Sequence, residues 1–184
     1  GTSKGLNRWD GYRFKQYFSD KENPQSLSGN RIQYIYPDPD GSLWIGTSDG
    51  LNRYDPQRDV FTHYLHSDSD SSTLSSNNVV AITKDLQGKL WIGTYNKGLN
   101  YFDEGTGAFK KVELQIEAPF PFDYNQIRSL FCDSSGIIWV GFNYSGLVRL
   151  DPKTLAHQFF FDFTENRKTW EINGINYIVQ PSNH

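Results

Sequence analysis

The sequence predicts an all-β protein in which a unit of four short strands is repeated along the chain. The first observation behind this prediction is a motif of the type Leu-Trp-Ile-Gly, whose tryptophans lie 47 and 48 residues apart: Trp44, Trp91 and Trp139. The second is a segment led by asparagine that keeps the same period and begins at Asn30, Asn77, Asn125 and Asn173. Two independent landmarks that share one period in this range indicate a repeat architecture.

The repeat at 30–65 illustrates why each unit predicts four strands, here at 32–36, 43–47, 51–54 and 60–65. The first two strands are joined by Asp38-Pro39-Asp40-Gly41, which has Pro second and Gly fourth, as a type I turn prefers. Gly50 can adopt positive φ, so it allows a tight hairpin between the second and third strands. Four antiparallel strands in under about 50 residues are typical of one blade of a β-propeller.

The predicted fold is therefore a β-propeller segment with three complete four-stranded blades and partial blades at both ends. We expect a partial blade at 1–18, full blades at 30–65, 77–113 and 125–163, and the first strand of a further blade at 173–180. The chain begins inside a repeat, so its natural N-terminus is expected to be missing. Closed propellers have four to eight blades, so we expect a piece of a larger ring, with a homodimer of eight blades as the alternative.

The repeated tryptophans and glycines are predicted to pack between blades, because each blade is covered on both faces by its neighbours. Each Trp buries a large area there, and the glycine two residues later permits a close approach of the next blade. These glycines are Gly46, Gly93 and Gly141. Trp9 occupies the repeat position of Tyr54 and Phe102, so it too is predicted to lie in the core rather than to stack on a ligand.

Composition and motifs argue against several function classes. The 184 residues carry a net charge of −3 with no cluster of Lys and Arg, which is a poor fit to nucleic acid. No apolar run reaches the length of a membrane span. Cys132, the only cysteine, lies in an apolar strand pattern and is read as a small buried residue. No catalytic residue, metal site or cofactor is predicted, since the spacing of the histidines does not suit metal binding.

Two stretches carry a resemblance to a known family. The first is Leu43-Trp44-Ile45-Gly46-Thr47 with the Gly50-Leu51-Asn52-Arg53-Tyr54-Asp55 that follows, and the second is the link Asn23-Pro24-Gln25-Ser26-Leu27-Ser28-Gly29-Asn30. They resemble the two-component regulator propeller repeats of bacterial sensors. The similarity extends over essentially the whole chain, is strongest over 1–103, and weakens after Gly141, where Phe142 replaces the Thr of the motif.

The resemblance implies a role in signal transduction. Such propellers form the periplasmic sensor region of bacterial, Bacteroides-type hybrid histidine kinases, many of which detect oligosaccharides released from complex glycans. The chain would then sense a carbohydrate, while the kinase and the membrane attachment would belong to parts of the parent protein that are missing here. The localisation and the oligosaccharide ligand rest on this likeness and not on residue chemistry.

Ligand contacts are expected at the rim formed by the links between blades and the hairpins between second and third strands. The candidates are Tyr95, Asn96, Lys97, Asn143, Tyr144, Arg31 and Arg128. Tyr with amide neighbours suits a sugar, although loops also carry such residues for packing or solvation. The Asn that opens each first strand is more readily explained as a cap that bonds nearby backbone.

Two other functions stay open at this point. A protein-interaction scaffold would use the same rim without a small ligand. A propeller-based lyase or glycoside hydrolase would need unrepeated acid and base groups that converge at the rim. Only Asp123 and Glu171 lie close before a first strand, and they belong to different blades, so the enzyme interpretation is the weaker one.

Overall fold

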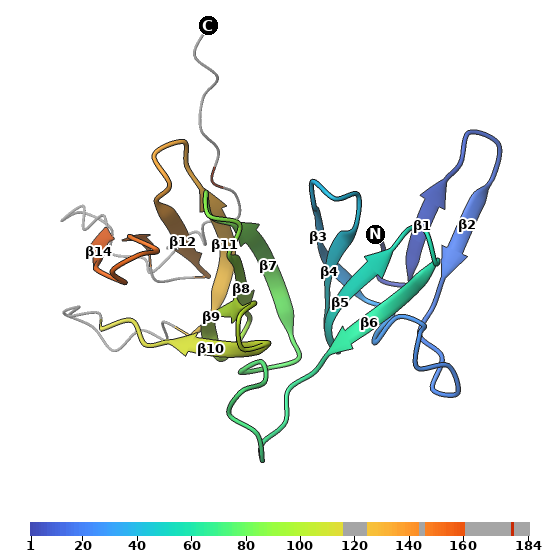
Figure 1. Ribbon diagram of the computed structural model, residues 1–184, viewed down its shortest axis with the longest axis horizontal. Helices are drawn as coiled ribbons and strands as arrows, with labels where there is room; N and C mark the ends of the chain where they lie inside the picture. The colour runs from blue at the N-terminus through green and yellow to red at the C-terminus, as the bar shows by residue number, and fades with distance from the viewer. Residues whose placement is uncertain (116–124, 144–145, 161–177, 179–184) are drawn as a thin grey trace, which may run out of the picture.

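The computed structural model describes residues 1–115, 125–143, 146–160 and 178, which contain 14 strands and no helix (Figure 1). Within the same residues, no helix has the length and apolar character needed to cross a membrane. The chain opens with a two-stranded antiparallel sheet, here called the N-terminal hairpin, formed by β1 (Leu6–Trp9) and β2 (Phe14–Tyr17).

Three four-stranded antiparallel sheets follow, and in each the strands pair in the order of the chain. The first blade consists of β3 (Ile32–Pro37), β4 (Leu43–Thr47), β5 (Gly50–Asp55) and β6 (Val60–Tyr64). The second blade consists of β7 (Val79–Lys84), β8 (Leu90–Thr94), β9 (Gly98–Asp103) and β10 (Ala108–Val112). The third blade consists of β11 (Ile127–Cys132), β12 (Ile138–Phe142), β13 (Leu147–Leu150) and β14 (His157–Phe160).

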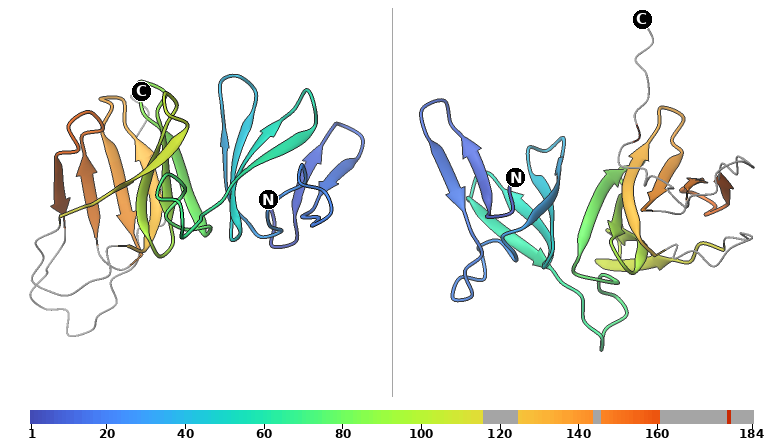
Figure 2. Two further views of the ribbon diagram at one scale, coloured as in Figure 1. Left: turned by 60° about the horizontal axis from the view of Figure 1, so that its bottom comes forward. Right: turned by 180° about the vertical axis from the view of Figure 1, so that it is seen from behind.

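This architecture confirms the predicted all-β propeller fold. The blades follow one another side by side in chain order, from the N-terminal hairpin at one end of the molecule to the third blade at the other (Figure 2). The first strands of neighbouring blades are in contact, β3 with β7 and β7 with β11, so these three strands form the inner edge of the segment. The strand expected at 173–180 lies outside the described residues, apart from Ile178.

The core lies between the blades, as the repeated Trp and Gly predict. Trp44 is 3% exposed and packs in one apolar cluster with residues of the second blade that include Val79 and Ile82. A β-carbon at Gly46 would lie 2.7 Å from the carbonyl oxygen of Val79, which is closer than any side chain tolerates. Glycine at this position therefore sets the distance between the first and second blades.

Each of the three tryptophans also hydrogen-bonds the aspartate that opens the turn before its strand. The indole Nε1 donates to a carboxylate Oδ2 at 2.9 Å in Trp44–Asp38, 3.1 Å in Trp91–Asp85 and 2.7 Å in Trp139–Asp133. The indole N–H is thus satisfied within its own blade, as the burial of Trp44 and Trp91 requires, and the half-buried Trp139 makes the same bond.

The links between blades are held by a buried asparagine on the third strand. Asn52 on β5 accepts a hydrogen bond from the Ser28 amide at 2.9 Å and donates to the Ser28 hydroxyl at 2.9 Å. Asn100 on β9 makes the same pair of bonds to Ser75, at 3.1 and 2.8 Å. These contacts fix where the chain leaves one blade and begins the next, and so they position the rim.

The prediction that Trp9 lies in the core is wrong. Trp9 is 55% exposed, and its ring packs against the neighbouring Phe14 within the hairpin, at 4.8 Å between centroids. Tyr54, at the same repeat position, is buried because Tyr17 of the preceding hairpin packs against it. In the described part of the chain no sheet precedes the N-terminal hairpin, so the outer face of that hairpin remains uncovered.

Candidate functional site

A β-bulge recurs at the start of the innermost strand of every blade. In each blade the pairing with the second strand shifts by one residue, between Ile32 and Tyr34, Val79 and Ala81, and Ile127 and Ser129. The extra residues at the bulges are Gln33, Val80 and Arg128. A bulge leaves the extra residue out of the ladder and re-aims its side chain.

All three bulge residues line one cavity of about 500 Å³ at the inner edge of the segment. The innermost strands supply nearly all of its wall, since the lining residues are Arg31, Ile32, Gln33, Tyr34, Val80, Arg128, Ser129, Leu130 and Ile178. A volume of this size is typical of sites for small organic ligands. The cavity therefore lies where the central channel of a propeller is expected.

The hairpins between second and third strands lie beside the start of the innermost strands. The first residue of each hairpin donates its backbone N–H to the residue just before the bulged segment, in Ser48–Arg31, Tyr95–Asn78 and Asn143–Gln126, at 3.3, 2.9 and 2.9 Å. In the second blade, Asn78 also accepts a hydrogen bond from Gln33 Nε2 at 2.5 Å. A short path of bonded residues thus leads from the hairpin at Tyr95 to the wall of the cavity.

The structure divides the predicted ligand residues into two groups. Arg31 and Arg128 line the cavity together, although they come from different blades. The hairpin residues Tyr95, Asn96 and Lys97 lie outside its lining, on the β8–β9 connection of the second blade. Among the other candidates, Asn143 is placed at the end of β12, and Tyr144 lies outside the described residues.

Local hydrogen bonds hold two of the predicted hairpin side chains in place. Asn96 Oδ1 accepts a hydrogen bond from the Ser76 hydroxyl at 2.9 Å, and Asn143 Nδ2 donates to Gln126 Oε1 at 3.3 Å. Tyr95 is 38% exposed and offers an aromatic side chain at the rim. The capping role expected of the leading asparagines is borne out at Asn30 and Asn77, which accept bonds from the backbone of Ser19 and His66 at 2.8 and 2.7 Å.

Sequence reasoning missed Gln33 and Val80. Both follow an apolar residue in a segment that the sequence predicts as a regular strand. In a regular strand successive side chains point to opposite faces of the sheet, and nothing in the sequence indicates that a bulge interrupts this alternation. The signal that could have found them is their repeat position, since they occupy the same position in their repeats as Arg128, which is a candidate because it lies two residues past Gln126 at the rim.

The histidines of the described region have structural partners. His63 Nε2 lies 2.5 Å from the Ser26 carbonyl oxygen, and His66 Nδ1 lies 2.6 Å from that of Leu74. His157 contacts the carbonyl oxygens of Leu155 and Gln115, both at 3.0 Å. Burial raises the pKa of the Cys132 thiol, which disfavours the thiolate that a nucleophile requires. Asp123, Glu171 and His184 lie outside the described residues.

Comparison with known proteins agrees with the repeat pattern. The sequence profile of the family described as two component regulator propeller matches residues 26–49, 73–96 and 121–144. Each match begins in the link before a blade and ends in the hairpin after the second strand, so it spans the bulged innermost strand. No curated protein matches the chain.

Two solved structures illustrate the similarity. The extracellular domain of a hybrid two component system from B. thetaiotaomicron is 27% identical, with a TM-score of 0.61, over 85% of this chain and 27% of that one. The chain thus spans about a quarter of the length of that domain. Virginiamycin B lyase from Staphylococcus aureus is 15% identical, with a TM-score of 0.63, over 88% of this chain and 50% of the lyase. At this identity the lyase shows a shared fold alone.

Proposed function

Because the chain is a segment of two-component regulator propeller repeats, we propose that it senses a glycan-derived oligosaccharide in the periplasm. The signal would pass to a histidine kinase located elsewhere in the parent protein. The cavity between the innermost strands is the proposed ligand site, and the hairpin residues Tyr95, Asn96, Lys97 and Asn143 form a second contact surface at the rim.

The observation that carries this proposal is the convergence of all three bulge residues on one cavity. Each blade has a β-bulge in its innermost strand, and the bulge residue of each lines the cavity. Bulges are over-represented beside functional sites. The cavity offers two charged donors, the Gln33 amide and the Tyr34 ring, which together suit a polar ligand with apolar faces. A sugar has this mixed character.

The chemistry of the site favours binding over catalysis. Among the described residues that line the cavity, none is Asp, Glu, His or Cys, so these residues offer no general acid or base of the usual kind. The likeness to a lyase concerns the fold and gives no support to an enzyme. A scaffold for another protein would use the rim and leave the cavity empty, which the experiment below distinguishes.

The test is calorimetric titration of the chain with a panel of neutral and acidic tri- and tetrasaccharides, repeated on a variant with a filled cavity. Val80→Trp adds a large side chain at the bulge of β7, and Thr62→Trp adds the same side chain on the exposed outer strand β6. We expect at least one oligosaccharide to bind, and Val80→Trp to weaken it by about tenfold or more. The Thr62→Trp variant should bind normally.

Two results would count against the proposal. If no saccharide of the panel binds the chain, a sensor for a released oligosaccharide is not supported. If Val80→Trp binds as tightly as Thr62→Trp, the ligand does not occupy the cavity. Replacement of Tyr95 by Ala tests the rim separately, because that side chain lies outside the cavity lining.

A further inference from the structure

We infer that the saccharide recognised in this cavity carries a negative charge, a carboxylate or a sulfate ester, held between Arg31 and Arg128. The inference rests on the proposed function and names the chemical class of its ligand. It begins from charge: the described lining residues include two arginines and no carboxylate, in a chain whose net charge is −3. The described part of the cavity wall therefore carries cationic side chains in a protein that is negative overall.

The backbone at the start of two innermost strands fixes the positions of the two arginines. Arg128 is the bulge residue of β11, and Arg31 immediately precedes β3, where its carbonyl oxygen accepts the bond from the Ser48 amide. Both side chains belong to the lining of the same cavity, so one ligand in it can contact both arginines. The guanidinium group also matches planar or tetrahedral oxyanions with two parallel hydrogen bonds, which makes it selective for carboxylate and sulfate.

The remaining polar wall explains why the anion should be part of a saccharide. The Gln33 side chain donates its Nε2 to Asn78, which orients the amide and leaves its carbonyl oxygen as an acceptor. An acceptor in the wall suits a hydroxyl group, whereas a bare oxyanion has no proton to donate to it. A cavity of about 500 Å³ is also larger than a single inorganic anion needs.

A comparison of the three blades indicates that the bulge position selects the ligand. The residue before each bulge is β-branched in every blade, as Ile32, Val79 and Ile127. The bulge residue itself changes from Gln33 to Val80 to Arg128, which are amide, apolar and cationic. A constant framework that presents side chains of three different kinds to one cavity is the arrangement expected of specificity-determining positions.

The experiment compares matched ligands on the full chain by calorimetry. The acidic probes are trigalacturonate and a sulfated galactobiose, the neutral probes are galactotriose and galactobiose, and inorganic sulfate is the anion without a sugar. The variants are Arg31→Gln and Arg128→Gln. Arg58→Gln removes the same charge from an exposed turn, where the Arg58 side chain is 82% exposed, and serves as the control.

We expect one of the acidic probes to bind about tenfold or more tightly than its neutral counterpart, and to weaken as salt is added. Each cavity variant should lose about tenfold in affinity for that probe, while Arg58→Gln binds normally. Thermal unfolding of each variant checks that it is folded, and Arg31→Gln decides the matter if Arg128→Gln does not fold.

The contrary outcomes separate this inference from the proposed function. If a neutral probe binds as tightly as its acidic counterpart and Val80→Trp abolishes that binding, the sensor proposal stands and the charge inference fails. If inorganic sulfate binds as tightly as the acidic saccharides, the site is for a free oxyanion and the inference fails. If no saccharide binds, both proposals fail.

Discussion

At the scale of single residues, the turn aspartate has two structural roles, of which the sequence reveals one. One role is to bond the turn backbone, as Asp at the first position of such a turn commonly does: Asp85 Oδ1 accepts hydrogen bonds from the amides of Gln87 and Lys89 at 3.0 and 2.9 Å. The other role is to accept the indole N–H of Trp91 through Oδ2. This second bond follows from the tertiary position of the indole, which residue spacing alone does not specify.

The double role predicts that Asp85→Asn destabilises the fold although the two side chains have the same shape. Asn has one carbonyl oxygen, so either the turn amides or the buried Trp91 N–H loses its acceptor. We expect the free energy of unfolding in urea to fall by about 1–3 kcal/mol. Asp70→Asn is the control, because the exposed Asp70 uses only Oδ1, to accept from Ser72. Equal stabilities of the two variants would contradict the double role.

At the scale of elements, strands and turns were predictable because their signals are local. The Asp and Gly of each turn and the apolar strands between them repeat with one period, and the blades follow from them. The bulges were not predictable, since they depend on how β3, β7 and β11 pair with their neighbours. For this reason Arg31 and Arg128 were predicted as rim residues from their places at the start of the first strands, while the bulge residues Gln33 and Val80 were overlooked.

The docking of the N-terminal hairpin on the first blade depends on one carboxylate. Asp59 Oδ1 accepts hydrogen bonds from the hydroxyls of Tyr54 and Tyr17 at 2.7 and 2.8 Å, and its other oxygen pairs with Lys15. Arg8 Nη1 donates to the Tyr54 hydroxyl at 2.7 Å. The hydrogen bond and charge of Lys15, with the tyrosine hydroxyls, lower the pKa of Asp59 from 3.8 to about 2.

This lowered pKa predicts a pH-dependent contribution to stability. A carboxyl with a lower pKa in the folded state stabilises the fold above its unfolded pKa of 3.8, and that stabilisation is lost as the pH falls toward 2. Because the Asp59 side chain is 36% exposed, we expect the effect to be about 1 kcal/mol after solvent screening. Asp59→Asn keeps an acceptor but removes the charge. The difference in unfolding free energy between the two proteins should be largest at neutral pH and shrink below pH 3.8; a constant difference would rule out this role.

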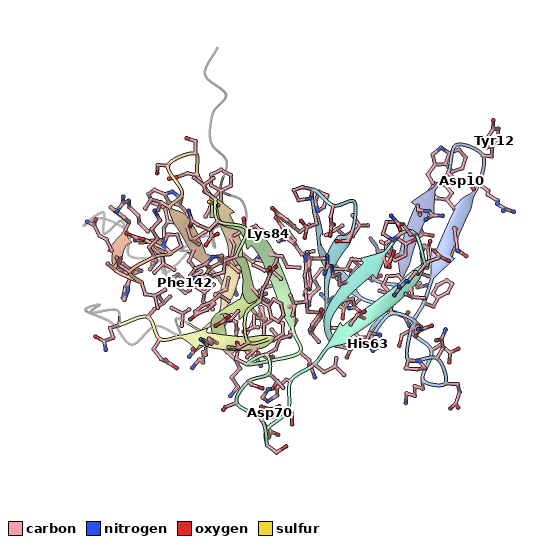
Figure 3. All side chains as sticks on the ribbon, viewed as in Figure 1. Asp10, Tyr12, His63, Asp70, Lys84 and Phe142 are labelled. Carbon is pink, nitrogen blue, oxygen red and sulfur yellow. The ribbon has the colours of Figure 1, made fainter. Side chains whose placement is uncertain are left out.

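At the scale of the whole molecule, apolar side chains packed between the blades, together with a few polar contacts, hold neighbouring blades together. Lys84, labelled in Figure 3, lies at the end of β7. Its Nζ lies 2.6 Å from Asp38 Oδ2 of the first blade, and the same carboxylate oxygen accepts a hydrogen bond from the Trp44 indole. Both ends of this ion pair are largely buried. The packing surfaces were predictable from the repeat, whereas the exposure of Trp9 was not, because it depends on which neighbouring sheet is present.

The close contact between Gly46 and Val79 predicts that a larger residue at position 46 would separate the first two blades. Gly46→Ala would place a β-carbon 2.7 Å from the Val79 carbonyl oxygen and 2.8 Å from Val79 Cγ1, so the first and second blades must move apart. Overpacking of this kind costs about 1–3 kcal/mol, which urea unfolding would measure. Gly105→Ala is the control, because the nearest atom to the new methyl group is the Asp103 carboxylate of its own exposed turn, at 3.3 Å.

Faster amide exchange in β4 and β7, with β12 and β13 unchanged, would locate the damage at this interface. If Gly46→Ala matches Gly105→Ala in both measurements, the glycine does not set the spacing. Because β3 and β7 both line the cavity, a real change in that spacing should also alter ligand affinity, which links the packing of the ring to its function.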